Sequence, residues 1–232
     1  MSAALKNITV KLGERPVLNG FSARFEEGKI NCLLGPSGVG KTTVLNVLAG
    51  LTKFEGQAER PEKISYIFQE SRLLNHLSVW ENVEYVLMFM PEKERAPRIK
   101  RLLELTEIYD RRNDFPTALS GGMARRVAMA RAYAYPAELL LMDEPFSALD
   151  IALKLRQMEV YNALSKEFPR TSVFVTHDMD EALLFADKIF VMRSGVGTDA
   201  EFDISTPRET RTLFSEEAAN IKKKMFELLS VK

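Results

Sequence analysis

The segment GPSGVGKT, residues 35–42, restricts the possible folds of this chain more than any other stretch. It follows the apolar run KINCLL at 29–34, and apolar residues recur at helical spacing from Val44 to Leu51. A glycine-rich loop between a strand and a helix points successive backbone N–H groups at one anion, and the helix start adds roughly half a positive charge. The pattern predicts a strand–loop–helix unit that cradles a phosphate. The alternative, a chance glycine turn, would not explain why a strand precedes the loop and a helix follows it.

The residues of this loop have separate expected roles. Gly38 and Gly40 carry no side chain, so the backbone can curl around the phosphate. Lys41 reaches the β and γ phosphates of a nucleotide, and Thr42 offers its hydroxyl to Mg²⁺. The residues expected to bind the nucleotide here are Gly35, Pro36, Ser37, Gly38, Val39, Gly40, Lys41, Thr42 and Thr43.

Composition sets wider limits. The 232 residues, 46% hydrophobic and 28% charged, suffice for a substantial core in one compact unit. The 32 basic and 32 acidic side chains give a net charge of zero, which argues against nucleic acid as the main partner. Cys32 lies in an apolar run, which predicts a buried, inert thiol. No stretch approaches the roughly 18 apolar residues that span a bilayer, and the start lacks a signal-peptide pattern, so we expect a soluble protein.

The remaining segments predict an α/β fold. Alternating residues at 7–12, 21–25 and 29–34 predict an antiparallel beginning. The part from 77 to 109 has helical spacing. After Pro136 strands and helices alternate, which predicts a parallel sheet covered by helices. A C-terminal helix is expected to be capped by Ser215 and to dock through a stripe of Phe214, Ala218, Ile221, Met225 and Leu228.

In the segment LLLMDEP, residues 139–145, an apolar run is followed directly by two acidic residues, Asp143 and Glu144. Carboxylates in this position lie at the carboxyl edge of a parallel sheet, where ligands bind. We expect Asp143 to hold Mg²⁺ and Glu144 to polarise an attacking water as a general base. The alternative for Glu144, a surface acid before Pro145, is equally compatible with this segment alone.

Two further polar residues end strands. His177 follows TSVFVT and is placed to hydrogen-bond a γ phosphate; Gln69 follows KISYIF and is placed to touch Mg²⁺ or the water. Taken singly, each is better explained as a structural residue. A third feature, Ser120 before Gly121 and Gly122, begins a helix with a hydroxyl cap and bare N–H groups, although a simple serine cap would give the same pattern.

The order of these motifs resembles that of the ATP-binding subunits of ABC transporters over nearly the whole chain. The motifs are the loop at 35–42, Gln69, LSGGM at 119–123, LLLMDEP at 139–145, SALD at 147–150 and His177. The resemblance implies a P-loop NTPase (RecA-like) fold, with an antiparallel β portion and an inserted helical subdomain. It divides the single domain, 1–232, into a nucleotide-binding core of 1–72 and 136–232 and a helical subdomain of 73–135.

The same resemblance implies a homodimer that forms on ATP binding, with ATP and Mg²⁺ as cofactors. In that family two subunits face head to tail, so Ser120, Gly121 and Gly122 close the nucleotide held by the opposite copy. Asp150 lies in the SALD motif and is implied to line the same seam. The helix then needs no lysine of its own, because the other copy's Lys41 supplies one.

The chain departs from the family pattern at two positions. Met123 stands where glutamine is usual, although importer subunits of the nitrate, sulfonate and taurine type often share this methionine. Residues 1–20 contain no aromatic residue, so by register Leu12 takes the place of the ring that usually stacks on adenine. We expect weaker ATP affinity than in relatives with that ring, because stacking contributes about 1–3 kcal/mol. Leu12→Tyr should tighten nucleotide binding.

The implied function is the energy-coupling ATPase of an ABC importer for a small anion or related nutrient, peripheral on the cytoplasmic face of the membrane. The tail TPRETRTLF resembles the nitrate, sulfonate and taurine group. Expected partners are transmembrane permease subunits, contacted through 69–83 unless Trp80 and its neighbours only pack internally, and indirectly an external binding protein. An export or membrane-remodelling ATPase is the alternative. A soluble ABC ATPase acting on DNA or ribosomes fits less well, because this chain has one cassette and no sustained heptads between Lys41 and Ser120.

Overall fold

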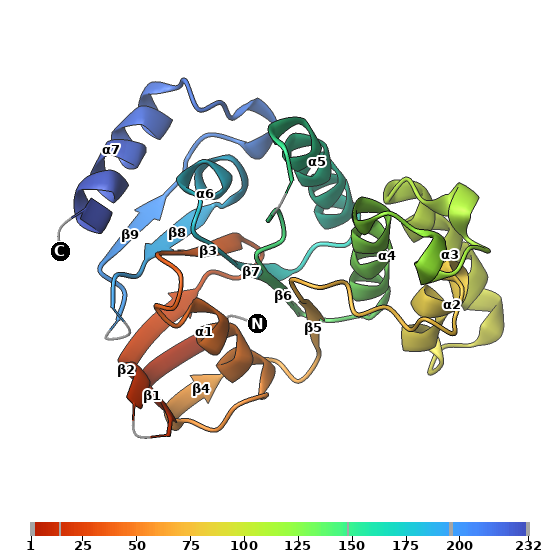
Figure 1. The fold of residues 1–232 in the computed structure, drawn as a ribbon, viewed down its shortest axis with the longest axis horizontal. Helices are drawn as coiled ribbons and strands as arrows, with labels where there is room; N and C mark the ends of the chain where they lie inside the picture. Colours follow the sequence, from red (N-terminus) through yellow and green to blue (C-terminus); the bar gives the residue numbers. More distant parts are fainter. Residues whose placement is uncertain (1–2, 14, 148, 195–196, 231–232) are drawn as a thin grey trace.

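The central element is a six-stranded sheet (Figure 1). The computed structural model describes residues 3–13, 15–147, 149–194 and 197–230. The strand order is β5-β6-β7-β3-β8-β9, and every neighbouring pair is parallel except β8 and β9. The strands are β3 (Ile30–Leu34), β5 (Ile64–Ile67), β6 (Leu139–Asp143), β7 (Thr171–Thr176), β8 (Lys188–Val191) and β9 (Ala200–Asp203). The prediction of a mostly parallel sheet is confirmed.

A second, antiparallel sheet contains β1 (Ala3–Leu12), β2 (Arg15–Phe25) and β4 (Glu55–Glu59) in the order β2-β1-β4. Helix α1 (Lys41–Ala49) joins the two sheets: its buried residues share one apolar cluster with side chains of β1 and β2 and with Leu33 of β3. The expected antiparallel beginning is confirmed for β1 and β2, whereas the third expected strand, 29–34, is β3 of the central sheet and pairs in parallel with β7 and β8. The antiparallel sheet packs on the helix that follows the glycine-rich loop.

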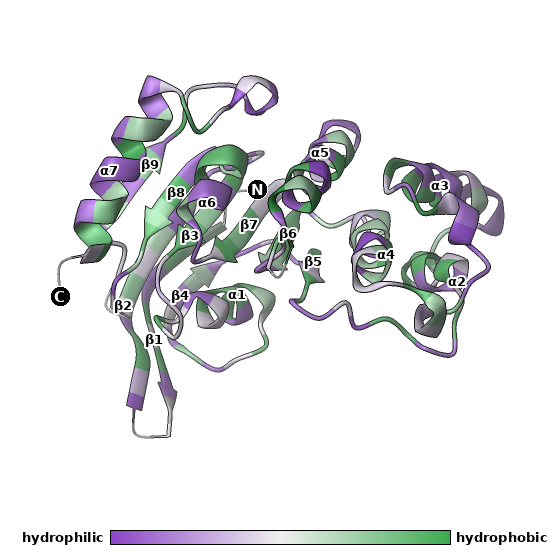
Figure 2. Ribbon diagram, turned by 45° about the horizontal axis from the view of Figure 1, so that its top comes forward, coloured by the Kyte–Doolittle hydropathy of each residue, from purple (hydrophilic) through white to green (hydrophobic). Residues whose placement is uncertain are grey.

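Three helices, α2 (Val79–Glu84), α3 (Glu92–Leu105) and α4 (Gly121–Ala134), lie together beyond the β5 edge of the sheet (Figure 1). The other helices are α5 (Ile151–Glu167), α6 (Met179–Phe185) and α7 (Glu216–Ser230). Short 3₁₀ turns interrupt the helical part at 85–87, 109–111 and 116–118, and another lies at 208–210. Figure 2 shows the hydrophobic segments gathered in the strands of the central sheet, where all five residues of β3 and all six of β7 are buried.

The sequence and the structure differ at two strands and one side chain. The sequence did not predict β4 or β9, which are edge strands with mostly exposed or half-buried residues. Phe214 was expected on the docked stripe of the last helix, but α7 begins after it and its side chain is 95% exposed. Ser215 does cap α7, since its Oγ accepts from the Ala218 N–H at 3.2 Å. Within the described residues, no helix is long and apolar enough to cross a membrane.

Candidate nucleotide-binding site

Three glycines of the loop are needed, either for their backbone conformation or because a side chain has no room. Gly38 has φ +81° and Gly40 has φ +106°, a region that side-chain-bearing residues rarely adopt. At Gly40 an added Cβ would also lie 2.8 Å from the Leu18 Cδ2 atom. Gly35 has an ordinary φ, but its Cβ would lie 2.2 Å from the backbone oxygen of Met192. The loop conformation is therefore imposed by the chain's own backbone and packing.

Lys41 opens α1 and is only 5% exposed. Its Nζ donates to the carbonyl oxygens of Gly35 at 2.7 Å and Pro36 at 2.9 Å, so the ammonium lies across the loop. Burial lowers the pKa of Lys41, while the carboxylate of Glu144 opposes that shift. A buried ammonium held only by neutral carbonyls gains a stronger partner when an anion enters the loop.

Two of the three expected cation ligands, Thr42 and Asp143, are adjacent. The Thr42 hydroxyl donates to Asp143 Oδ1 at 3.1 Å, joining the start of α1 to the end of β6. Burial raises the pKa of Asp143, and the bond from Thr42 opposes that change. The described residues hold no group of three or more His, Cys, Asp or Glu side chains suited to a metal. The pair instead suits Mg²⁺, which is commonly held by one or two protein oxygens together with phosphate oxygens.

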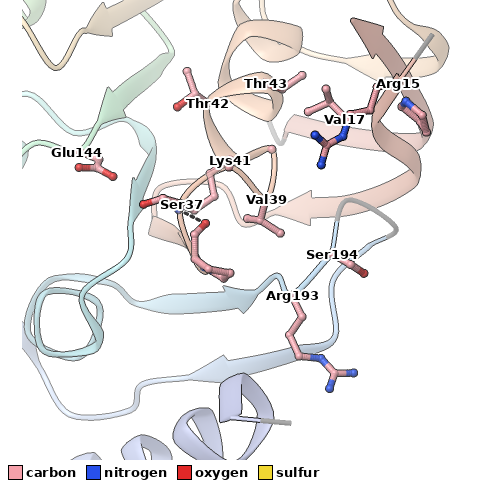
Figure 3. A pocket seen from close by; sticks show the side chains of 14 residues that line it. Arg15, Val17, Ser37, Val39, Lys41, Thr42, Thr43, Glu144, Arg193 and Ser194 are labelled. Atoms are coloured by element: carbon pink, nitrogen blue, oxygen red, sulfur yellow. Dashed lines mark hydrogen bonds between the residues drawn. The ribbon is translucent and has the colours of Figure 1, made fainter. Parts of the chain in front are cut away.

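Glu144 and His177 meet at the same edge, with Nδ1 of the histidine 3.2 Å from Oε1 of the glutamate. Glu144 has φ +44°, which is uncommon for a residue with a side chain, and its N–H donates to the Val175 carbonyl at 3.1 Å. The strained backbone places the carboxylate beside the loop (Figure 3). Strain of this kind is frequent where a side chain must be aimed at a ligand.

The cavity over the loop has a volume of about 840 Å³. It brings the residues from Pro36 to Thr43 together with Glu144 (Figure 3). Gln69 is exposed just after β5 and does not line this cavity, nor do Asp143 and His177, which lie along the same sheet edge. The sequence did not single out the other lining residues, Arg15, Pro16, Val17, Arg193 and Ser194.

One positioning residue was also missed. Arg125 of α4 donates from its guanidinium to three backbone carbonyls, those of Pro145 at 3.0 Å, Ser147 at 3.1 Å and Gln69 at 3.3 Å. It therefore ties the segment after Glu144 to the segment that carries Gln69. No motif signals this contact, because the partners come from two segments that are both distant from Arg125 in sequence.

The serine-glycine stretch lies away from the cavity. Ser120 caps α4, its Oγ accepting from the Met123 N–H at 3.3 Å. Gly121 and Gly122 are exposed, neither has positive φ, and a Cβ on either would meet nothing within 4 Å. Asp150 caps α5 by accepting from the Leu153 N–H at 2.9 Å. None of these four residues lines the cavity of its own chain.

The Leu12 prediction falls on a side chain outside the described part of the structure; only its backbone, at the end of β1, is described. Cys32 is buried as expected, and burial raises the pKa of its thiol.

The glycine cradle, the buried lysine and the acid-tipped strand β6 of the same sheet define a nucleotide-binding cassette of the P-loop NTPase class. Residues 18–147, more than half of the chain, match the family described as ABC transporter. The chain therefore belongs to the ABC transporter family.

Relatives and solved structures agree with this placement. The sulfate/thiosulfate import ATP-binding protein CysA of Escherichia coli (strain K12) is 36% identical, over 92% of this chain and 64% of its own length. CysA of Yersinia pseudotuberculosis is 37% identical, over 87% and 61%. The chain thus spans less than two thirds of the length of these relatives. The dimeric structure of MJ0796, a bacterial ABC transporter cassette, matches with TM-score 0.76 and 32% identity, over 88% of this chain and 100% of that one. The post-hydrolysis dimer of MJ0796 bound to ADP and Pi matches with TM-score 0.75 and 31% identity.

Proposed function

We propose that this chain is the ATP-hydrolysing, energy-coupling subunit of an ABC import system. The observation that carries the proposal is the alignment of the glycine cradle, the Thr42–Asp143 pair and the Glu144–His177 pair along one edge of the sheet. The CysA relatives are named as import proteins for the anions sulfate and thiosulfate. We propose a small anion or related nutrient as cargo, of the nitrate, sulfonate and taurine type to which the tail TPRETRTLF is similar.

The proposed roles follow from position. Backbone N–H groups of the loop and the Lys41 ammonium bind the phosphates. Thr42, Asp143 and Gln69 would hold Mg²⁺, which supplies charge neutralisation on the phosphate oxygens. Glu144 accepts a proton from the attacking water and aligns it, and His177, held against Glu144 at 3.2 Å, donates to the terminal phosphate.

The other half of the site is proposed to come from a second copy of the chain. Nothing in the described part of the chain requires glycine at 121 or 122, since both have ordinary φ and no described atom lies within 4 Å of an added Cβ. The N–H groups of Gly121 and Gly122 at this helix start can approach an anion held by another copy. We assign the Ser120 hydroxyl, these two glycines and Asp150 to the nucleotide of the opposite protomer. The dimeric MJ0796 cassettes support this arrangement.

The remaining proposals concern lobes, partners and location. We propose that 73–135 form a helical lobe beside a nucleotide-binding core of 1–72 and 136–232. The lobe and segment 69–83 would contact membrane-spanning permease subunits, which are linked indirectly to an external binding protein, so the chain would lie on the cytoplasmic face of the membrane. Co-purification separates the candidates: a permease with a binding protein supports import, whereas a permease alone supports export or remodelling.

The decisive experiment is Glu144→Gln, with Glu159→Gln on the exposed face of α5 as the matched control. Glu144→Gln should keep ATP binding but reduce turnover about 10²- to 10⁴-fold, because the amide cannot accept the proton. With ATP it should elute as a dimer in gel filtration, while Glu159→Gln should behave like the wild type. Near-normal turnover by Glu144→Gln would remove this residue from the mechanism, and a variant that stays monomeric with ATP would contradict the shared site.

A further inference from the structure

The cavity over the glycine-rich loop has two chemically different ends. Figure 3 shows Glu144 at one end and Arg15 with Val17, both on β2, at the other, with the loop between them. Under the proposed function, Glu144 marks the end at which the terminal phosphate reacts. The nucleoside of a bound nucleotide therefore extends toward β2.

The β2 end presents cations and aliphatic groups. Its side chains are those of Arg15, Pro16 and Val17, with Arg193 and Ser194 from the segment after β8, and no described residue lining the cavity is aromatic. Stacking on a ring, the usual way to hold a base, is therefore not offered by these side chains.

The two arginines differ in their hydrogen-bond partners. Arg193 is engaged with Asp199, its Nε 3.0 Å from Oδ1, and reaches the Leu228 carbonyl of α7 at 3.5 Å. Figure 3 shows its side chain pointing away from the loop. Arg15 is exposed, and its guanidinium has no hydrogen-bond or ion-pair partner in the described ranges of the chain.

We propose that Arg15 is a specificity-determining residue that covers one face of the nucleobase. A guanidinium is planar and weakly hydrated, so it stacks on aromatic faces in a way that an ammonium cannot. Pro16 and Val17 beside it add apolar contact to the same wall. The inference rests on the proposed function, because it takes the ligand to be a nucleoside triphosphate. It assigns to Arg15 a contact with the base and none with the phosphates.

The test compares ATP with inorganic tripolyphosphate, which has the phosphates but no base. Dissociation constants of both, with Mg²⁺, are measured by titration calorimetry on the full chain for Arg15→Ala, Arg15→Lys and Arg15→Trp. Arg24→Ala is the matched control, because Arg24 is an exposed arginine of the same strand outside the cavity. We expect Arg15→Ala to weaken ATP binding about 5- to 30-fold and to leave tripolyphosphate binding unchanged. Arg15→Lys should behave like Arg15→Ala, and Arg15→Trp should recover ATP binding.

Each outcome separates this inference from the proposed function. If the wild type binds no ATP, the proposed function fails. If it binds ATP and Arg15→Ala binds it equally well, only the role of Arg15 fails. Equal weakening of ATP and tripolyphosphate would show a phosphate contact and overturn the base-stacking role. Because Arg15 is exposed, unchanged thermal unfolding of the variants is expected and checks that folding is not the cause.

Discussion

The two helices α1 and α4 both begin with glycines, but only one of these starts is explained within the chain. At α1 the glycines are forced: Gly38 and Gly40 have positive φ, and Gly35 has no room for a side chain. At α4, Gly121 and Gly122 have ordinary φ and open space around them. The loop before α1 is a complete anion-binding loop within one chain, whereas the start of α4 is an exposed surface.

This difference indicates that the glycines of α4 serve something outside their own chain. Glycine in the middle of a helix is destabilising by roughly 0.5–1 kcal/mol relative to alanine, and the two glycines in the first turn of α4 bear part of this cost with no packing benefit in return. Because the fold of the chain itself gives no reason for these two glycines, we explain them by a ligand or partner that approaches the start of α4 closely. The comparison predicts that glycine substitutions at the two sites separate folding from activity.

The largest effect is expected from Gly35→Ala. Its Cβ would meet the Met192 carbonyl oxygen at 2.2 Å, and a backbone atom cannot rotate away as a side chain can. We expect a loss of stability of about 3 kcal/mol or more together with loss of ATP binding, measured by chemical unfolding and titration calorimetry. A Gly35→Ala protein with wild-type stability would show that the loop yields readily, and the contrast with α4 would disappear.

The next effect is expected from Gly121→Ala, which should separate stability from turnover. The added methyl group meets nothing within 4 Å, and alanine favours the helix, so the free energy of unfolding should stay equal or rise by up to about 1 kcal/mol. ATP turnover should nevertheless fall at least about tenfold, because the methyl group keeps the helix N–H groups from an anion on the other protomer. Unchanged turnover in a steady-state assay would show that no close approach occurs at α4.

The sequence predicts those parts of the fold that rest on local patterns. The buried strands β3, β6 and β7 are short segments rich in apolar residues, and the loop before α1 is a contiguous motif, so both are visible without tertiary information. Strands β4 and β9 lack such a pattern: EGQAE is almost fully exposed and becomes a strand by pairing with β1. Its structure is imposed by its neighbour, which no local rule detects.

The same distinction applies to the site. Lys41, Thr42, Asp143 and Glu144 stand in motifs whose neighbours place them at a sheet edge. Arg15 and Arg193 reach the cavity from segments far apart in sequence, and nothing in their immediate surroundings marks them. Phe214 shows the opposite error, because helical spacing extended the last stripe by one residue beyond the Ser215 cap.

A smaller effect, with an internal control, is expected from serine caps. Ser120 Oγ accepts from the Met123 N–H at 3.3 Å, and Ser215 Oγ accepts from the Ala218 N–H at 3.2 Å, so the two caps are nearly equivalent. Ser120→Ala and Ser215→Ala should each reduce the free energy of unfolding by about 1 kcal/mol. Only Ser120→Ala should also reduce ATP turnover, because only that hydroxyl is proposed to meet a phosphate. Equal turnover in the two variants would make Ser120 an ordinary cap.

The smallest effect concerns the first turn of α7, which carries a carboxylate that is hydrogen-bonded to another segment of the same chain. The Glu217 carboxylate in its first turn accepts from the N–H and hydroxyl of Ser205, at 2.8 and 2.5 Å, and from those of Thr206, at 3.2 and 2.6 Å. These bonds lower the pKa of Glu217 to about 2. Because the folded-state pKa lies below the ordinary value of 4.5, the stabilisation is fully present above about pH 4.5 and is lost as the pH falls toward 2.

Glu217→Gln should therefore reduce the free energy of unfolding at pH 7 by roughly 1 kcal/mol after solvent screening, with the difference from the wild type shrinking below pH 4.5. Urea unfolding at pH 7, 5 and 3.5 measures this, with Glu216→Gln, an exposed neighbour, as the control. ATP turnover at pH 7 should not change, because Glu217 bonds to Ser205 and Thr206 of its own chain and does not line the nucleotide cavity. If turnover fell as expected for Gly121→Ala, hydrogen bonding within the chain would no longer distinguish a structural helix start from a functional one.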